Sequence, residues 1–169
     1  MSGIQLPSVF ITGLFETHLK VRNLERSMEF YEKIVGLELG MKEQVRRVAF
    51  YWIGGQGKTA LGLWENPPWA SEREVEDQII KQHFAFEIDP ANLDRAVAGI
   101  KQRGIEPRNF FEQTTDVPSV FGWLPAASIY FNDPDGHLLE FIAKLPDKAR
   151  PEIGVVSLDE WNRLNQTSD

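Results

Sequence analysis

The two halves of the chain carry the same order of predicted secondary structure, and this repetition constrains the fold more than any other feature. Each half is predicted to form one strand, one helix and at least two further strands. These segments are residues 14–21, 24–35, 47–53 and 59–64 in the first half, and 83–88, 93–103, 127–131 and 137–143 in the second. A chain of 169 residues is long enough to bury a core shared by two such modules.

The remaining residues divide the chain into four parts. The two modules are predicted to span residues 14–65 and 83–143. A linker rich in proline and charged residues is predicted over 66–82, and a C-terminal arm with one short helix over 144–169.

The helix predictions rest on apolar periodicity and on capping residues. In both helices, apolar side chains recur at spacings of three and four residues, which is typical of one buried helix face. Asn23 and Asn92 precede the helices where an N-cap is expected. Gly36 and Gly104 follow them where a C-terminal glycine is expected.

Composition excludes several classes of protein. Because the chain has no cysteine, it cannot form a disulfide, an iron–sulfur cluster or a thiol nucleophile, and a bound metal needs His, Asp or Glu ligands. The net charge of −7 argues against nucleic acid or an anionic membrane as partner. The start of the chain does not resemble a signal peptide, and no apolar stretch has transmembrane length, so we expect a cytoplasmic protein.

A hairpin near the end of the second module carries the most specific pattern in the chain. The strand SIYF, the turn NDPDG and the return strand HLLEFI together occupy residues 128–142. In the return strand, Leu138, Glu140 and Ile142 share one face. A carboxylate buried between two aliphatic side chains is costly unless a basic side chain or a metal ion accompanies it. His137, at the end of the turn, is predicted to be exposed and to face away from Glu140.

Together with the segment VRNLERSMEFYEKIVGLELG at residues 21–40, this hairpin resembles the vicinal oxygen chelate superfamily. Its members include glyoxalase I, bleomycin-binding proteins, fosfomycin thiol transferases and extradiol dioxygenases. The resemblance covers residues 14–143 and implies an α+β fold of two βαβββ modules whose curled sheets form a metal-binding cup. We also expect a homodimer, because each module offers a sheet with an open edge, and the modules then pair either within or between chains.

The resemblance implies that His83 and Glu140 bind the metal, from the first and last strands of the second module. On the first strand of module one, counting back five residues from Val21 gives Glu16 as the third ligand, with His18 facing the substrate as a catalytic group. Aligning the modules on their histidines makes His18 the ligand instead. Both candidates point the same way, because alternate residues of a strand share a face. In a third interpretation neither residue touches a metal.

Two further residues are substrate-binding candidates. The spacing from Gly57 to Leu61 repeats that from Gly136 to Glu140, so Leu61 is predicted to line the pocket where the family can have a fourth ligand. Three protein ligands leave a coordination position open for water or substrate, as catalysis requires. Trp123 is predicted either to close over a bound ligand or to anchor a surface loop.

The sequence therefore predicts a glyoxalase-like metalloenzyme that uses Mn, Fe, Ni, Zn or Mg to bind and activate a small oxygenated substrate. Lyase, isomerase, thiol-transferase and dioxygenase activities all fit this description. The alternative is a metal-free protein of the bleomycin-resistance type, in which an acidic groove lined by tryptophan sequesters a cationic aromatic drug.

Overall fold

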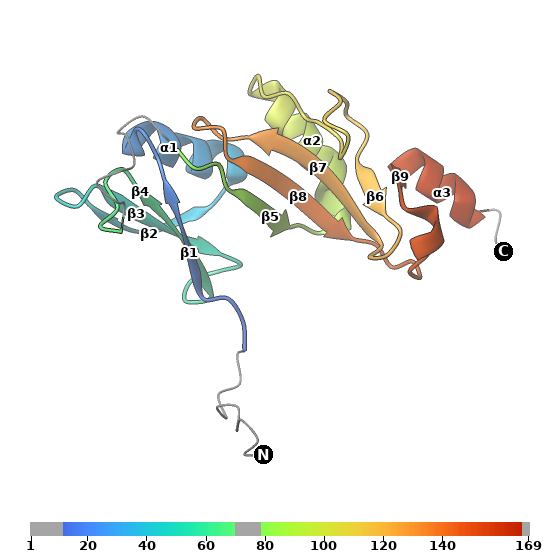
Figure 1. Ribbon diagram of the computed structural model, residues 1–169, viewed down its shortest axis with the longest axis horizontal. Coiled ribbons are helices and arrows are strands. Elements are labelled where there is room, and N and C mark those ends of the chain that lie inside the picture. The colour runs from blue at the N-terminus through green and yellow to red at the C-terminus, as the bar shows by residue number, and fades with distance from the viewer. Residues whose placement is uncertain (1–11, 70–78, 167–169) are drawn as a thin grey trace, which may run out of the picture.

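The computed structural model describes residues 12–69 and 79–166, which form two β-sheets with helices packed against them (Figure 1). The first sheet has the order β1-β4-β3-β2 and the second the order β5-β8-β7-β6-β9. The first half contains β1 (Glu16–Lys20), α1 (Leu24–Phe30), the π-helical turn η1 (Tyr31–Val35), β2 (Glu38–Glu43), β3 (Val48–Ile53) and β4 (Thr59–Trp64). The second contains β5 (His83–Glu87), the 3₁₀ turn η2 (Pro90–Asn92), α2 (Leu93–Gln102), β6 (Ser119–Phe121), β7 (Ala126–Asn132) and β8 (Leu138–Lys144).

The predicted α+β architecture is confirmed, and so is its repetition. In each sheet, the first strand of the module pairs in parallel with the last one, β1 with β4 and β5 with β8. The residue pattern located neither β2 nor β6, although the βαβββ modules that the resemblance implies contain a third strand after each helix, and it did not indicate the C-terminal β9 (Val155–Ser157). β2 is a largely exposed edge strand and the other two have three residues each, so none shows the alternating apolar pattern of a half-buried strand.

Capping follows the prediction at both ends of the first helix and at the C-terminal end of the second, where Gly104 has φ 75°. The Asn23 side chain accepts a hydrogen bond from the Arg26 N–H (2.8 Å), and Gly36 ends η1 in the left-handed region at φ 82°. Asn92 directly precedes α2 as predicted, but its side chain makes no capping hydrogen bond. Its backbone is already helical as part of η2, and Asp89 caps that turn by accepting from the Ala91 N–H (2.8 Å).

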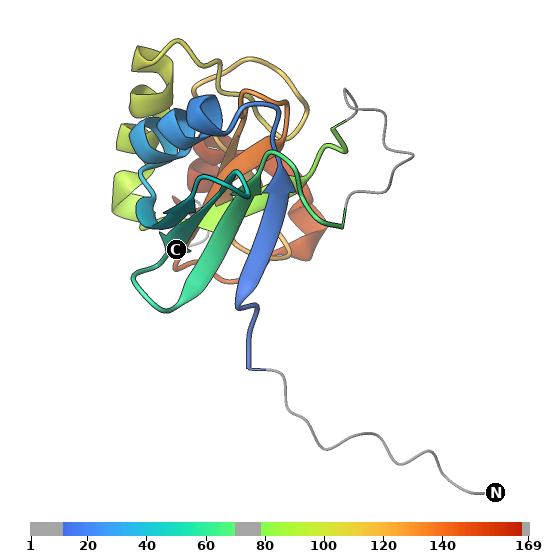
Figure 2. The same cartoon turned by 90° about the vertical axis from the view of Figure 1, so that its left-hand side faces the viewer.

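One hydrophobic core joins the two modules. It contains Leu19, Leu61 and Leu63 from the first sheet and Leu139 and Phe141 from the second, packed against α1 and α2. Figure 2 shows these helices together on one side of the sheets. Because successive strand residues face opposite ways, the residues between these core positions lie on the sheet faces away from the helices.

The C-terminal arm extends the second sheet. It passes through η3 (Pro151–Ile153), pairs β9 with β6, and ends in the predicted helix, which the structure places at Leu158–Gln166 (α3). Trp161 anchors this helix, because its ring is fully buried in a second small core and its indole N–H donates to the Asp147 carboxylate (3.0 Å).

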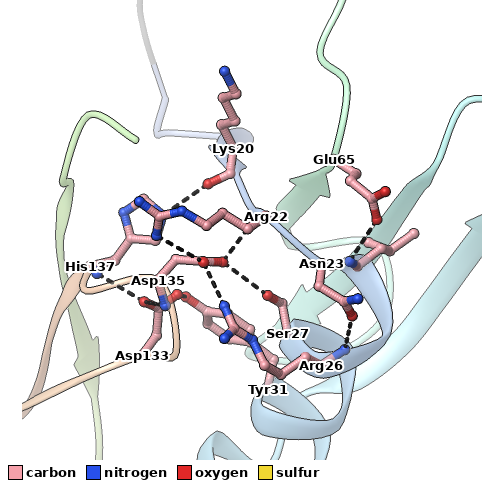
Figure 3. A network of polar contacts seen from close by, with 11 residues as sticks. Lys20, Arg22, Asn23, Arg26, Ser27, Tyr31, Glu65, Asp133, Asp135 and His137 are labelled. Atoms are coloured by element: carbon pink, nitrogen blue, oxygen red, sulfur yellow. Dashed lines mark hydrogen bonds and ion pairs between the residues drawn. The ribbon is translucent and has the colours of Figure 1, made fainter. Parts of the chain in front are cut away.

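The NDPDG turn of module two contacts the start of α1 in module one, as Figure 3 shows. The fully buried Asp135 carboxylate accepts from the guanidinium groups of Arg26 (2.6 Å) and Arg22 (3.4 Å), and also from the backbone N–H of Arg22 (3.1 Å). Charge-assisted bonds of this kind are stronger than neutral ones. The turn therefore holds the modules together, a role its resemblance to the family did not indicate.

Asp133 and His137 complete this contact. Asp133 accepts from the phenol of Tyr31 (3.0 Å), and burial raises the pKa of its carboxyl group. The expected exposure of His137 is wrong: its side chain is fully buried, Nδ1 accepts from the Gln82 N–H (3.1 Å), and Nε2 lies 3.0 Å from the Lys20 carbonyl. Its position in a turn suggested exposure, but this turn is covered by the other module.

Within residues 12–69 and 79–166, no helix is both long and apolar enough to span a bilayer. Most of the predicted linker, residues 70–78, lies outside the described residues. The division of the chain into modules at 14–65 and 83–143 remains a prediction.

Candidate metal and substrate site

Four residues that the sequence indicates as ligands or catalytic groups form two separate pairs, one on each sheet. In the second sheet, His83 Nε2 lies 3.2 Å from a carboxylate oxygen of Glu140. In the first, His18 Nε2 lies 3.5 Å from a carboxylate oxygen of Glu16. Among the described residues, no group of three or more His, Asp or Glu side chains is close enough to hold a metal. One chain therefore does not bring the predicted ligands of the two modules together.

The pair in the second sheet contains a buried acceptor without a partner. Glu140 is only 4% exposed, and its Oε1 atom makes no hydrogen bond. Tyr130 lies opposite Glu140 on β7, and burial, together with the Glu140 carboxylate, raises the pKa of its phenol. A buried carboxylate oxygen without a donor costs free energy, so this atom is a position at which a cation or a donor would be stabilised.

The donor set fits a divalent transition metal. An imidazole nitrogen and a carboxylate oxygen converge within 3.2 Å, and both kinds of donor bind Zn, Mn, Fe and Ni in proteins. His83 lies on the edge strand β5 and has a half-exposed ring, so it is accessible from solvent. Glu140 and His83 would therefore offer two ligands to such a metal, and further ligands would have to come from outside this pair.

Backbone hydrogen bonding shows which positions of the two modules correspond. The N–H of Val21 donates to a β4 carbonyl (2.8 Å), and the N–H of Ile88 donates to a β8 carbonyl in the same way (2.9 Å). Glu16 and His83 each lie five residues before these positions. The register thus aligns Glu16, and not His18, with His83.

The same register changes the role of Leu61. On β8, Glu140 lies two residues before Ile142, whose carbonyl accepts the Ile88 N–H. On β4, the accepting carbonyl is that of Trp64, so the position that corresponds to Glu140 is Gly62. Leu61 faces the opposite way and is 1% exposed within the core, so it does not line a pocket on the ligand face. The glycine spacing misplaced this residue by one, and a shift of one residue along a strand reverses the face.

The His18 ring fills the space above Gly62. A Cβ atom on Gly62 would lie 2.4 Å from His18 Nδ1 and 3.1 Å from Phe50 Cε1. The indole N–H of Trp64 donates to His18 Nδ1 (3.0 Å), and the imidazole ring contacts the ring of Trp69 at a centroid distance of 5.2 Å. Only glycine at position 62 leaves room for this arrangement.

Gly62→Ala is expected to lower the free energy of unfolding by about 1–3 kcal/mol, because the methyl group must displace the His18 ring. Gly99→Ala, in α2, is the matched control: its Cβ would meet nothing closer than 3.5 Å, and helix propensity favours alanine by up to about 1 kcal/mol. Urea unfolding measures both. Equal stability of Gly62→Ala and the wild type would contradict the packing of His18 against Gly62.

A cavity of about 200 Å³ opens beside His83. Its lining residues are His83, Arg108, Asn109, Phe110, Glu112, Tyr130 and Leu138. Arg108 is held there because its backbone pairs with that of Tyr130 through two hydrogen bonds (2.8 and 2.9 Å). Among the described residues, the Arg108 guanidinium makes no ion pair with a carboxylate.

Sequence reasoning missed both Arg108 and Tyr130. Tyr130 has a recognisable signal, because it belongs to the strand SIYF that pairs with the strand of Glu140. Arg108 has none, since it lies in an irregular segment and reaches the cavity only through its pairing with β7.

Trp123 is not part of this cavity. It lies in the turn between β6 and β7 and is 65% exposed. The first paired residue after this turn is Ala126, four positions along β7 from Tyr130. Phe110 lines the cavity in its place, so the segment around Arg108, and not the loop of Trp123, borders the pocket beside His83.

Comparison with known proteins places this geometry in a family. Residues 13–141 match the model of the Glyoxalase/Bleomycin resistance protein/Dioxygenase superfamily. The chain is 28% identical to the metallothiol transferase FosB of Shouchella clausii over 168 residues, covering 90% of this chain and 99% of the relative. It is 31% identical to the lactoylglutathione lyase of Neisseria meningitidis over 136 residues, covering 78% and 90%.

The fold is shared with solved structures. An integron cassette protein from the mobile metagenome of the Halifax Harbour sewage outfall superimposes with a TM-score of 0.62 at 33% identity, covering 79% of this chain and 99% of that one. The sequence match covers more than half of the chain. The two curled sheets, each with its first and last strands paired in parallel, agree with this match. This chain belongs to the Glyoxalase/Bleomycin resistance protein/Dioxygenase superfamily.

Proposed function

We propose that this protein is a metal-dependent enzyme acting on a small oxygenated substrate that carries a negative charge. The buried, unpartnered Oε1 atom of Glu140 beside His83 is the observation that carries this proposal. The similarity to a metallothiol transferase and a lactoylglutathione lyase supports an enzyme of this kind.

Glu16, His83 and Glu140 would hold the metal. A divalent metal bound there supplies Lewis-acid stabilisation of negative charge that develops on a substrate oxygen. The alignment of Glu16 with His83 supports Glu16 as the ligand from the first module. His18, next to Glu16 on the same face of β1, then faces the substrate.

The cavity beside His83 supports an anionic substrate. The Arg108 guanidinium has no carboxylate partner among the described residues and can pair with a carboxylate or a phosphonate. The Tyr130 phenol, whose pKa is raised mainly by burial and also by the Glu140 carboxylate, is a neutral O–H that can donate a hydrogen bond to the same substrate.

The site is completed between two chains in this proposal. The shared core and the NDPDG turn fix the modules of one chain with their helices together, and the ligand pairs lie on two different sheets. A second copy that packs the first module of one protomer against the second module of its partner would bring Glu16 to His83 and Glu140. We therefore infer a homodimer with two such sites.

Glu16→Ala is expected to lose the metal, because it removes one of three ligands, whereas His18→Ala is expected to retain it. Protein purified without a chelator would be analysed for metal content, together with the shift in melting temperature on adding Mn²⁺, Ni²⁺ or Zn²⁺. Loss of metal in His18→Ala with retention in Glu16→Ala would make His18 the ligand. Absence of metal in the wild type, with no shift for any ion, would refute the enzyme and favour a sequestering protein.

Mixing two inactive variants tests pairing between chains. Glu16→Ala and Glu140→Gln dimers, unfolded together and refolded, would form hybrids in which one site carries both changes and the other carries neither. Recovery of metal binding in the mixture is expected. No recovery from hybrids, or a mass of 19.3 kDa by light scattering, would show that each chain forms its site alone.

A further inference from the structure

We infer that Trp64 is a positioning residue that fixes the tautomer of His18, so that this histidine presents an N–H, and not a lone pair, to the metal and substrate site. The inference concerns the role of His18 and rests on the proposed function for its catalytic meaning. The position of the proton itself follows from contacts within β1 and β4.

A hydrogen bond joins the Trp64 and His18 rings. The Trp64 indole Nε1 lies 3.0 Å from His18 Nδ1. An indole N–H can only donate, so Nδ1 must accept and cannot carry a proton. In the neutral ring, the proton is then on Nε2.

Neighbouring residues confine the His18 imidazole ring. Gly62 lies directly behind it, and the rings of Phe50 and Trp69 contact it at centroid distances of 5.6 and 5.2 Å. Turning the ring over would place a carbon atom against the Trp64 N–H. The Trp64 side chain is largely buried, and a buried indole N–H without an acceptor is unfavourable.

The other ring nitrogen of His18, Nε2, points toward Glu16. His18 Nε2 faces the Glu16 carboxylate, with its nearest oxygen at 3.5 Å. A nitrogen that carries a proton has no lone pair with which to bind a metal. His18 therefore serves as a hydrogen-bond donor to Glu16 or to a substrate oxygen, which leaves Glu16 as the ligand on this strand.

The tautomer can be measured directly by long-range ¹H–¹⁵N correlation spectra of the histidine rings. The chain has three histidines, and His18→Gln assigns the signals of His18 by their disappearance. At pH 8.5, above the ordinary titration range of imidazole, the wild type is expected to show His18 with its proton on Nε2. A wild-type spectrum with the proton on Nδ1 would overturn the inference, and this result does not depend on any variant.

Trp64→Phe removes the donor and retains an aromatic ring. In this variant His18 is expected to populate both tautomers, while His83 and His137 keep their wild-type signals. Trp69→Phe is the matched control, because Trp69 packs against the same ring and has no hydrogen bond to it among the described contacts. An unchanged His18 tautomer in a folded Trp64→Phe variant would show that Trp64 does not fix it.

Zn²⁺ added to the wild type separates this inference from the proposed function. We expect the His83 signals to shift while His18 keeps its proton on Nε2. If Zn²⁺ moves no histidine signal, the proposed metal site fails, but the tautomer result stands. If Zn²⁺ removes the proton from His18 Nε2, His18 is a ligand and the inference is wrong.

Discussion

Glu140→Gln is expected to weaken metal binding by more than about 100-fold while leaving the metal-free protein at least as stable as the wild type. Loss of an outer-shell partner alone can cost up to about 100-fold, and Glu140 is proposed to bind the metal itself. The metal-free form gains because the change neutralises a buried carboxylate with an unpartnered oxygen. Metal titration followed by thermal shift, and urea unfolding in EDTA, measure the two effects.

Glu87→Gln is the matched control for this experiment. Glu87 lies on β5 of the same sheet, its side chain is 63% exposed, and it pairs with Lys144 at 3.0 Å. Such a surface pair contributes little, so neither metal affinity nor stability should change by more than about 0.5 kcal/mol. If Glu140→Gln instead loses several kcal/mol of stability and keeps its metal affinity, Glu140 is a structural partner of His83.

Asp135→Ala is expected to lower the free energy of unfolding by about 3 kcal/mol, because it removes the carboxylate that connects the NDPDG turn to Arg22 and Arg26. The Arg22 and Arg26 side chains are about half exposed and can be hydrated when Asp135 is removed. The loss of stability is therefore expected at the lower end of the range for breaking a buried ion pair. Urea unfolding followed by circular dichroism and by tryptophan fluorescence measures the loss. The two signals should also separate if the modules no longer unfold together.

Asp94→Ala provides the comparison, since Asp94 is an exposed residue in the first turn of α2 and should change stability by no more than about 0.5–1 kcal/mol. The double variant Asp135→Ala with Arg26→Ala should lose less than the sum of the single changes, because the two residues share one bond. Additive losses of stability, or a loss for Asp135→Ala no larger than that for Asp94→Ala, would show that the Asp135–Arg26 contact does not hold the two modules together.

Much of the fold could be read from the sequence because local signals specified it. Apolar periodicity located the two helices and most long strands, and the Asn23 cap and the Gly36 end lie where local chemistry requires them. The residue pattern did not locate β2, β6 or β9, because these strands are held by hydrogen bonds to neighbouring strands and have no alternating apolar pattern of their own.

The residues of the candidate site were also predicted only in part from the sequence. His83 and Glu140 were predicted from the sequence, and the structure brings them within 3.2 Å of each other. Leu61 was misplaced, since one residue of register decides between the core and the ligand face, and only the pairing of β1 with β4 fixes that register. Arg108 could not be found at all, because its neighbours in space are distant in the chain.

The sequence by itself determined the family and the repeated order of strands and helices, and it indicated the candidate ligands, because periodicity and residue chemistry are properties of short segments. The tertiary structure decided which distant segments contact one another. It buried His137 under the other module, placed Gly62 behind His18, and set Trp64 as its donor. It also separated Glu16 and His83 onto different sheets, because the shared core and the Asp135 contact fix the two modules by their helices.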